Sequence, residues 1–419
     1  MRERPLAPHE AAVAASGVRL VLHSLVEGEP DGTLLARALA QLRVSCPLIA
    51  GRITTDGVRD GRPVVRVEES AAAPVLRRGT GFDEEINAPH TWEEGPLLRL
   101  ALLREAGRTR VVMTLPRAFA DGMSFLALHR RLWSFYTASA TGRPVASGAV
   151  EPVLGPALDE LLAAGTTPGQ LQDFVTERAK RDAEEPPALV PALASRGGGP
   201  GADLSFRVLG VAVGADRTEA LVRHARAASL TLNSLVCGAL LTGLRAQFPA
   251  ADGAVRLLCT TAVDMRRRFT PPLPAEVLQS AATTASLRIR VAHRVHPAEV
   301  GREVADRLRA DLESGAAAME PAAFPYMLDH HPPSLVITNV GTIAEPEVAD
   351  GLRIGEVRLA PLGHVPMIFA VLSRYRGRLN IDLTYSRAWY TDAQIRELAR
   401  EISATVDELA ATPVRPHMR

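Results

Sequence analysis

The sequence has few of the features that mark secreted, membrane or metal-binding proteins. Its three cysteines, Cys46, Cys237 and Cys259, are too few and too scattered for a disulfide framework or a zinc site, and we expect small buried side chains. No apolar run approaches the roughly 20 residues of a membrane span. The Ala-rich run between Glu10 and Arg19 is too short for the apolar core of a signal peptide. We therefore predict a cytoplasmic protein that has no metal centre and contacts no membrane.

The sequence also lacks an excess of charge and the common cofactor motifs. Its 48 Lys and Arg residues against 47 Asp and Glu residues give a formal net charge of +1. No basic block stands out, so we expect no nucleic-acid partner. The glycines at 197–199 are not preceded by a strand or followed by the Lys-Ser/Thr pair of a phosphate loop. No dinucleotide fingerprint, metal-ligand spacing or Ser/His/Asp arrangement is present, and we expect no cofactor.

The length of the chain predicts two domains. A chain of 419 residues exceeds the size at which one hydrophobic core normally suffices. Near its middle, the stretch EEPPALVPALASRGGGPGAD is too rich in proline and glycine for a regular helix or strand. We therefore predict an N-terminal domain at 1–182, a linker at 183–203 and a C-terminal domain at 204–419.

The segment from Val111 to Tyr136 is the most informative part of the chain. Its first residues predict a buried strand, which leads through a loop carrying Asp121 and Gly122 into a helix. The apolar residues of that helix recur at three- and four-residue spacing, as on one buried face: Phe125, Leu128, Leu132, Phe135 and Tyr136. His129 on the same helix is expected on a solvated face. A loop between two rigid elements is a common place for functional side chains.

Three other elements are predicted from local patterns. Residues 47–53 (PLIAGRI) are expected to form a strand. A mostly apolar helix follows Thr231, which can cap it, as can Asn233, and such a helix is usually buried. Thr391 and Gln394 have the spacing of a capping box at the start of the last helix.

Four short segments carry a resemblance to a known superfamily. They are PRAFADG at 116–122, PLLR at 96–99, VDMR at 263–266 and TNVG at 338–341. Together with their order, they resemble the H-H-x-x-x-D-G signature and accompanying motifs of the chloramphenicol-acetyltransferase-like superfamily. That superfamily includes nonribosomal peptide condensation domains and the polyketide-associated acyltransferases that esterify phthiocerol. Asp121 and Gly122 match the signature, whereas Pro116 and Arg117 stand where it has two histidines.

The resemblance implies the fold of the chain. It implies an α/β protein made of two acetyltransferase-like domains, each a mixed sheet flanked by helices, with a channel between them. An acyl thioester would enter one mouth of the channel, and an alcohol or amine would enter the other.

The resemblance also implies roles for three residues around the signature. The second signature histidine is taken to act as general base or to orient the nucleophile. Arg117 cannot accept a proton, because a guanidinium has no acceptor and stays charged. It would instead orient or polarise the acyl group. Asp121 would hold the loop by pairing with Arg266.

Four more residues are candidates for substrate binding. Gly122 would let the backbone turn tightly or approach a ligand closely. Ser124 would either point its hydroxyl toward the substrate or cap the helix. Asn339 would reach the substrate or close a turn. His364 is the candidate for a substitute base.

The leading hypothesis for function is a standalone acyltransferase or condensation-like enzyme of secondary metabolism with an altered active site. Its donor would be a carrier-protein or coenzyme A thioester, and its substrate a polyketide- or peptide-like natural-product intermediate. Two alternatives stay open. One is cyclisation, rearrangement or elimination on such an intermediate, with Arg117 stabilising an enolate or oxyanion. The other is a catalytically silent scaffold that binds a carrier protein.

Overall fold

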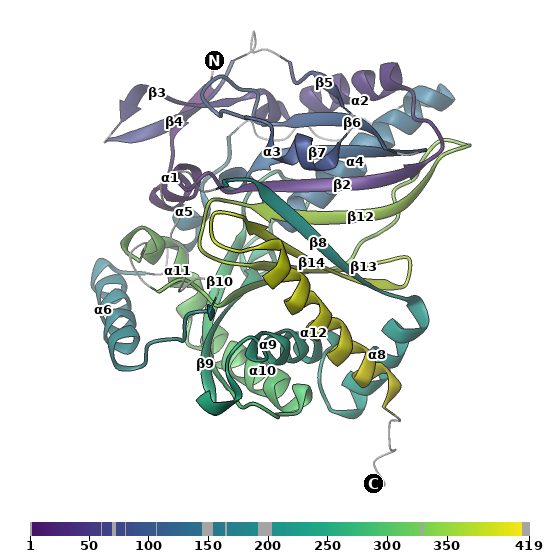
Figure 1. Cartoon of the computed structure of the whole chain (residues 1–419). Coiled ribbons are helices and arrows are strands. Elements are labelled where there is room, and N and C mark those ends of the chain that lie inside the picture. Colours follow the sequence, from purple (N-terminus) through teal and green to yellow (C-terminus); the bar gives the residue numbers. More distant parts are fainter. Residues whose placement is uncertain are drawn as a thin grey trace. The chain divides into compact units, whose positions relative to one another are not determined.

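The computed structural model describes residues 2–59, 61–68, 73–79, 81–105, 107–144, 154–163, 166–191, 203–327 and 331–412 (Figure 1). Two compact units account for the chain, and neither is one continuous stretch. The first consists of Met1–Ala164, Asp264–Ala282 and Ile343–Gly363. The second consists of Gly165–Val263, Thr283–Thr342 and His364–Arg419.

These units differ from the three consecutive segments predicted from the sequence. The chain first leaves the first unit for the second after Ala164, which is before the predicted linker at 183–203. Two later segments, Asp264–Ala282 and Ile343–Gly363, belong to the first unit because strand β12 and the loop after β9 pack there. Residues 192–202 of the predicted linker lie outside the described part of the chain. The predicted channel between domains stays a prediction.

The first unit is built on a five-stranded sheet of order β12-β2-β7-β6-β5. Its strands are β12 (Arg353–Leu362), β2 (Arg19–Glu27), β7 (Arg108–Pro116), β6 (Arg99–Glu105) and β5 (Leu76–Gly79). Neighbouring strands run antiparallel except β5 and β6, which run parallel. A three-stranded sheet of order β1-β4-β3 lies in the same unit, formed by Arg2–Pro5, Arg62–Val67 and Arg52–Arg59.

Helices flank this sheet. They are α1 (Pro8–Ala15), α2 (Gly32–Ser45), α3 (Phe82–Asn87), α4 (Gly122–Thr141) and α5 (Leu158–Ala163), with short 3₁₀ turns η1 (Pro47–Ala50), η2 (Arg117–Phe119) and η4 (Arg266–Arg268). Helices α2 and α4 pack against one another. The prediction of a strand over 47–53 is therefore wrong at its start, because Pro47 opens a 3₁₀ turn and the strand begins only at Arg52.

The strand and helix predicted from Val111 to Tyr136 are confirmed as β7 and α4. Every residue of β7 from Val111 to Pro116 is buried, and the five predicted apolar positions of α4 are all buried. The solvated position predicted for His129 is wrong. This side chain is 2% exposed, and its Nε2 atom accepts from Trp133 Nε1 at 2.9 Å and lies 3.1 Å from Ser24 Oγ.

The second unit contains a six-stranded sheet of order β10-β9-β11-β13-β14-β8. Its strands are β10 (Ala282–Val291), β9 (Val255–Asp264), β11 (Leu335–Thr342), β13 (Phe369–Tyr375), β14 (Arg378–Ser386) and β8 (Phe206–Val213). Strands β9, β11 and β13 run parallel, and β13, β14 and β8 run antiparallel. Both units are thus α/β, and each contains a mixed sheet flanked by helices, as predicted.

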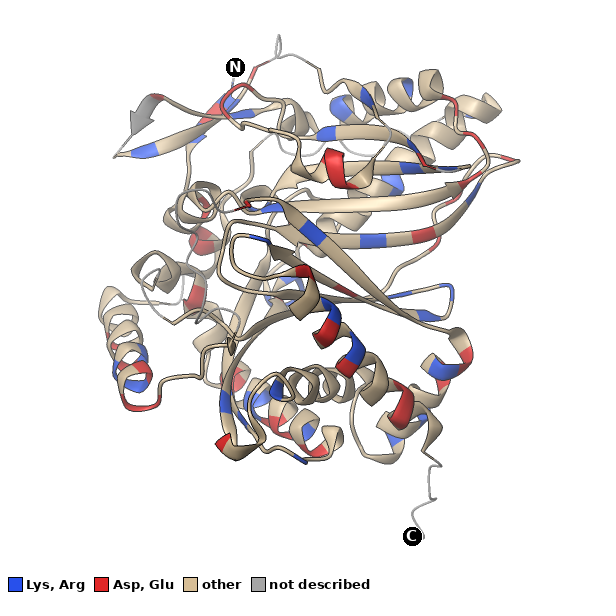
Figure 2. Ribbon diagram, viewed as in Figure 1, with Lys and Arg blue, Asp and Glu red and all other residues tan. Residues whose placement is uncertain are grey.

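The helices of the second unit are α6 (Pro168–Glu184), α8 (Ala215–Ala227), α9 (Leu232–Arg245), α10 (Pro297–Glu313), α11 (Ala316–Ala323) and α12 (Asp392–Ala411), with 3₁₀ turns η3 (Ala250–Asp252) and η5 (Phe324–Tyr326). The two predicted caps are confirmed: Thr231 caps the largely buried α9, and Thr391 with Gln394 forms a capping box on α12. Acidic and basic residues are interspersed along α12 (Figure 2).

No single helix among the described residues is long and apolar enough to cross a membrane. Helices α8 and α9 together meet that criterion by length and composition, but a bend of 100° separates them. Helix α9 packs against α10 and α12 within the second unit.

Candidate active site

The candidate site is the loop that joins β7 to α4 in the first unit. We call this loop, which runs from Arg117 to Asp121, the signature loop. Strand β7 is paired on both edges. Its pairing with β2 extends to Pro116, and its pairing with β6 extends to Thr114. The loop then makes the 3₁₀ turn η2, and α4 begins at Gly122. Because the strand and one face of the helix are buried, they hold the few residues between them in place.

Asp121 is the most heavily bonded residue of this loop. Its Oδ1 atom accepts from the backbone N–H groups of Met123 and Ser124, both at 3.0 Å, and so caps α4. Its Oδ2 atom accepts from Arg266 Nη1 at 2.5 Å and from the backbone N–H of Ala281 at 2.7 Å. Asp121 and Arg266 are each 3% exposed. The predicted pair is present, and it neutralises two buried charges.

Arg266 ties this loop to the segment that precedes β10. Its Nη2 atom donates to the carbonyl oxygen of Gln279 at 2.8 Å, and its backbone N–H donates to Asp264 Oδ1 at 3.0 Å. The N–H of Met265 donates to the carbonyl oxygen of Ala281 at 2.9 Å. The arginine therefore holds the two ends of the segment Asp264–Ala282 together and against the signature loop.

Arg117 is partly exposed, and its guanidinium donates three hydrogen bonds to protein oxygens. Nη1 donates to the carbonyl oxygen of Ala120 at 3.1 Å and to Ser280 Oγ at 2.5 Å, and Nη2 donates to the carbonyl oxygen of Ala282 at 3.2 Å. Burial lowers the pKa of Arg117 from its usual value, and the Asp121 carboxylate opposes this shift. Three of its five N–H donors are thus engaged, which leaves two that can face a ligand.

The structure supports the capping role predicted for Ser124 and changes the account of Gly122. Ser124 is 1% exposed, and its hydroxyl accepts from the backbone N–H of Asp121 at 3.2 Å and donates to the carbonyl oxygen of Gln279 at 3.1 Å. Gly122 is the first residue of α4 and has no positive φ, so the expected tight turn does not require glycine there. Close approach of a ligand to Gly122 stays a prediction.

Asn339 and His364 belong to the second unit. Asn339 Nδ2 donates to Asn233 Oδ1 at 2.9 Å, and its Oδ1 accepts from the N–H of Gly341 at 2.8 Å, so this side chain closes a turn. His364 is exposed and stacks on Phe206, with ring centroids 4.4 Å apart. Their roles toward substrate stay predictions.

Two residues near Arg117 were not found from the sequence. Ser280 accepts from its guanidinium, as described above, and His9 lies on α1, which packs against η2. Burial, and to a smaller extent the positive charge of Arg117, lowers the pKa of His9 to about 3. Neither residue belongs to a recognisable motif, and no local sequence signal connects either one to Arg117.

The described residues include no group of three or more His, Cys, Asp or Glu side chains that could hold a metal ion. All three cysteines are buried, as expected. Burial raises the pKa of Cys237 to about 12, so its thiol is poorly suited to act as a nucleophile.

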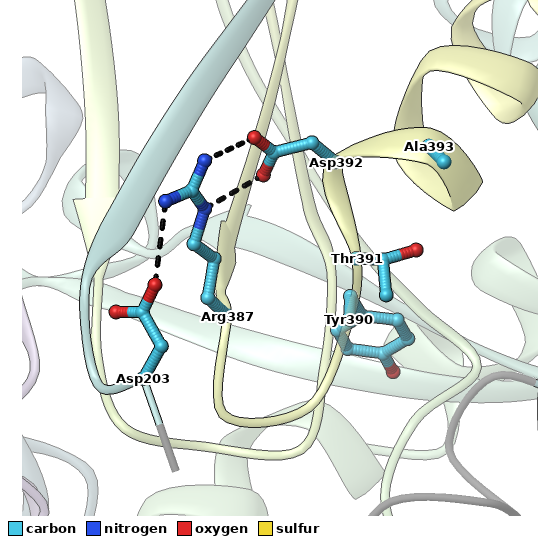
Figure 3. Close-up of a pocket in the computed structure, with 6 residues that line it drawn as sticks. All are labelled: Asp203, Arg387, Tyr390, Thr391, Asp392 and Ala393. Atoms are coloured by element: carbon cyan, nitrogen blue, oxygen red, sulfur yellow. Dashed lines mark hydrogen bonds and ion pairs between the residues drawn. The ribbon is translucent and has the colours of Figure 1, made fainter.

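A separate hollow of about 320 Å³ lies in the second unit, at the start of α12 (Figure 3). Its lining residues are Asp203, Arg387, Tyr390, Thr391, Asp392 and Ala393. The Arg387 guanidinium contacts both carboxylates, with Nε 2.9 Å from Asp392 Oδ1 and Nη1 3.3 Å from Asp203 Oδ2. All three charged groups are engaged in ion pairs with one another, so none of them is left unpaired for a ligand.

Comparison with known proteins agrees with this architecture. Residues 204–384 match the family model "Phthiocerol/phthiodiolone dimycocerosyl transferase C-terminus". No curated protein sequence matches the chain significantly.

Solved structures match over nearly the whole chain. Polyketide synthase associated protein 5 from Mycobacterium tuberculosis matches with a TM-score of 0.72 and 20% identity, covering 98% of each chain. The trichothecene 15-O-acetyltransferase TRI3 from Fusarium sporotrichioides gives 0.75 and 16%, covering 97% of this chain and 95% of the other.

The first condensation domain of the calcium-dependent antibiotic synthetase, in complex with a substrate analogue, gives a TM-score of 0.76 and 18% identity, covering 99% and 98%. The fold implied by the motifs is thereby confirmed. The chain thus has the fold of these solved structures, and its residues 204–384 are similar to the C-terminal part of the phthiocerol/phthiodiolone dimycocerosyl transferases.

Proposed function

We propose that the chain transfers an acyl group from a thioester to a nucleophile in the biosynthesis of a polyketide- or peptide-like natural product. The observation that carries this proposal is the intact scaffold of the signature loop. Asp121 still caps α4 and still binds Arg266, although Pro116 and Arg117 stand where the signature has histidines. Two similar structures, an acetyltransferase and a condensation domain, support acyl transfer as the class of reaction.

Arg117 would act on the acyl carbonyl in this reaction. The nucleophile attacks the carbonyl carbon, negative charge develops on the carbonyl oxygen, and the carbon–sulfur bond then breaks to release a thiol. A fixed cation near that oxygen stabilises the charge that develops. The two donors of Arg117 that no described residue accepts are suited to this role.

The donor would be a carrier-protein thioester or a coenzyme A thioester. The acceptor would be a small natural-product intermediate that carries an amine or a hydroxyl. Gly122, Asn339 and His364 are retained as proposed substrate contacts, and the protein needs no further cofactor for this reaction, because the thioester already activates the acyl group.

A catalytically silent scaffold for a carrier protein is the second candidate. The observation that favours it is the engagement of Arg117 by three protein oxygens, from Ala120, Ser280 and Ala282. An arginine held in this way can fill the place of the signature imidazole without taking part in chemistry.

The test is to incubate the protein with hexanoyl-N-acetylcysteamine and either benzylamine or benzyl alcohol. Free thiol and the mass of the product are measured for the wild type, R117A and R117H, with a reaction lacking protein as the blank. Acyl transfer above the blank, lost in R117A and accelerated in R117H, is the expected result. An isomerised or dehydrated donor would point to altered chemistry, and no change in either reactant would favour the scaffold.

A further inference from the structure

Arg117 is a partly buried cation without a counter-ion of its own. Its guanidinium donates to the carbonyl oxygens of Ala120 and Ala282 and to the hydroxyl of Ser280, none of which carries a charge. Among the described residues, no carboxylate forms an ion pair with this arginine. A charge that is partly removed from water is costly unless an opposite charge compensates for it. The signature loop therefore carries a positive charge that the described part of the protein does not balance.

The carboxylate of Asp121 cannot fill this role. Burial lowers the pKa of Arg117, the charge of Asp121 opposes this shift, and the charge of Arg266 adds to it. The oxygens of Asp121 already accept from two N–H groups of α4, from Arg266 and from the N–H of Ala281. Asp121 is therefore balanced by Arg266, to which it is bonded directly. Two cations thus share one carboxylate at this loop, and Arg117 is the cation that has no partner.

Another arginine shows how this protein buries a guanidinium that has only a structural role. Arg245, the last residue of α9, is 1% exposed and donates four hydrogen bonds to carbonyl oxygens of the residues that follow the helix. All three of its guanidinium nitrogens are engaged, and the carbonyl end of a helix favours a cation. Arg117 differs because its Nε atom makes no hydrogen bond to any described residue.

The two free N–H donors of Arg117 are on neighbouring nitrogens. Nη1 is used twice, by Ala120 and Ser280, and Nη2 is used once, by Ala282, so Nε and Nη2 each keep one donor. These two nitrogens share one edge of the planar guanidinium. Nε of Arg266 is buried without a partner, whereas Nε of Arg117 is not one of the buried and unpartnered atoms of the described residues. A ligand can therefore reach this edge.

We infer that the anion missing from Arg117 is a carboxylate of the substrate. This inference rests on the proposed acyl transfer and names the class of substrate. A carboxylate matches two donors on one edge of a guanidinium, which it accepts as a fork. A phosphate has further oxygens to satisfy, and the first N–H groups of α4, which could serve them, are already bonded to Asp121.

The carboxylate belongs either to the acyl donor or to the acceptor. In a malonyl-type donor, the carboxylate and the thioester carbonyl are joined through one carbon, so an oxygen of each can take one of the two donors. Arg117 then still stabilises the charge that develops on the carbonyl oxygen. In an amino-acid acceptor, the carboxylate takes both donors and Arg117 orients the amine.

The carboxylate itself does not react in either case. The carbon–nitrogen bond of an amide forms, the carbon–sulfur bond of the thioester breaks, and the thiolate leaves with the proton that the amine loses. The products are an amide that keeps its carboxylate and a free thiol. Arg117 therefore selects and orients a charged substrate, and it exchanges no proton.

The first arm of the test uses the wild-type protein and measures binding. Phenylglyoxal, which modifies accessible guanidinium groups, is applied at pH 8, and the modification of Arg117 is followed by peptide mass. Two pairs of probes of similar shape are added as protectants. Malonyl-N-acetylcysteamine is paired with the neutral acetoacetyl-N-acetylcysteamine, and phenylalanine is paired with phenylalaninamide.

One of the two carboxylates should protect Arg117 selectively. We expect it to slow the modification at least about fivefold more than its partner without a carboxylate, because hydrogen bonds between charged groups are the stronger ones. The exposed Arg130 on α4 should react at the same rate throughout. Equal protection within both pairs, or none, would overturn the inference. Better protection by inorganic phosphate than by either carboxylate would overturn the choice of a carboxylate.

The second arm compares R117Q with the matched control R130Q. Thiol release is measured with both members of the selected pair, and folding of each variant is checked by circular dichroism. We expect R117Q to raise KM for the carboxylate probe by about 10- to 100-fold, the range for hydrogen bonds to charged groups, and KM for its partner by less than about twofold. R130Q should change neither value. An equal rise for both probes in R117Q would contradict recognition of the carboxylate.

The outcomes separate the inference from the proposed function. Selective protection of Arg117 without release of thiol keeps the carboxylate site and removes acyl transfer. Release of thiol at equal rates from the carboxylate probe and its partner keeps acyl transfer and removes the carboxylate site. Selectivity within the thioester pair assigns the carboxylate to the acyl donor, and selectivity within the amine pair assigns it to the acceptor.

Discussion

Asp121 and Arg266 form a buried ion pair in which the carboxylate also caps a helix. One oxygen of Asp121 binds the first N–H groups of α4, and the other binds Arg266 Nη1 at 2.5 Å. The start of α4, the signature loop and the segment around Ala281 therefore share a single carboxylate. A change to either charged partner should affect all three.

Replacement of Arg266 by alanine should destabilise the protein strongly. It would leave Asp121 buried without a compensating charge, and removal of one partner of a buried pair typically costs about 3–5 kcal/mol. Chemical denaturation of R266A against the wild type measures the loss. The matched control is R130A, because the Arg130–Glu276 pair is more than half exposed on both sides and should contribute about 0–1 kcal/mol. Equal losses in the two variants would contradict this account of the loop.

His129 should make the stability of the protein sensitive to acid. Burial lowers its pKa to about 3, whereas an unfolded histidine titrates near 6.5. Between these values the unfolded state binds a proton that the native state does not, so the free energy of unfolding should fall as the pH falls from about 6.5 toward 3. The contribution of one such group approaches about 1.4 kcal/mol per pH unit.

The variant H129L tests this prediction by denaturation at several pH values. At pH 7 it should be less stable by about 1–3 kcal/mol, because the Trp133 indole N–H loses its acceptor. Its stability should fall less steeply toward low pH than that of the wild type. H293Q, which changes an exposed histidine, is the control and should keep the wild-type slope. An unchanged slope in H129L would show that His129 does not titrate as described.

The misplacement of His129 shows what periodicity can and cannot predict. Its spacing of four from both Phe125 and Trp133 puts it on the buried face of α4, which the apolar residues had correctly indicated. The prediction placed His129 in solvent because histidine is polar and the sequence shows no partner for it nearby. Its buried partner Ser24 lies on β2, far away in the sequence.

The same limit applies to the candidate site. The Asp121–Arg266 pair could be predicted because both residues lie in segments that resemble motifs of the superfamily. The bond from Arg117 to Ser280 and the approach of α1 to η2 could not, since they depend on how separate segments pack in the first unit. Local patterns likewise identified the caps at Thr231 and Thr391, whose contacts lie within four residues.

Helix α6 should detach when one of its ion pairs is broken. It has no buried side chain and is joined to the second unit by Arg178 with Glu320 on α11 and by Asp182 with Arg288 on β10. Arg288 is 6% exposed, so D182A would leave its charge buried without its ion-pair partner, at a cost of about 3–5 kcal/mol.

Limited trypsin digestion, which cleaves after residues such as Arg181 within α6, should be faster in D182A than in the wild type. The control E177A removes an exposed pair with Arg181 one helical turn away and should change stability by no more than about 0.5 kcal/mol. Digestion of D182A at the wild-type rate would mean that contacts other than this ion pair hold α6.

Replacement of Gly238 by alanine should separate two helices of the second unit. A Cβ atom at this position on α9 would collide with the carbonyl oxygen of Pro297 and lie 2.8 Å from the backbone nitrogen of Gly301, both on α10. Backbone atoms cannot rotate away as a side chain can, so the helices must move apart, at a cost of about 1–3 kcal/mol or more. The control is G169A on α6, where the added Cβ atom lies 4.0 Å from Thr167 Oγ1. Its free energy of unfolding should rise by up to about 1 kcal/mol, because alanine has a higher helix propensity than glycine. Thermal unfolding of both variants gives the comparison, and a G238A protein as stable as the wild type would show that α9 and α10 do not require this close contact.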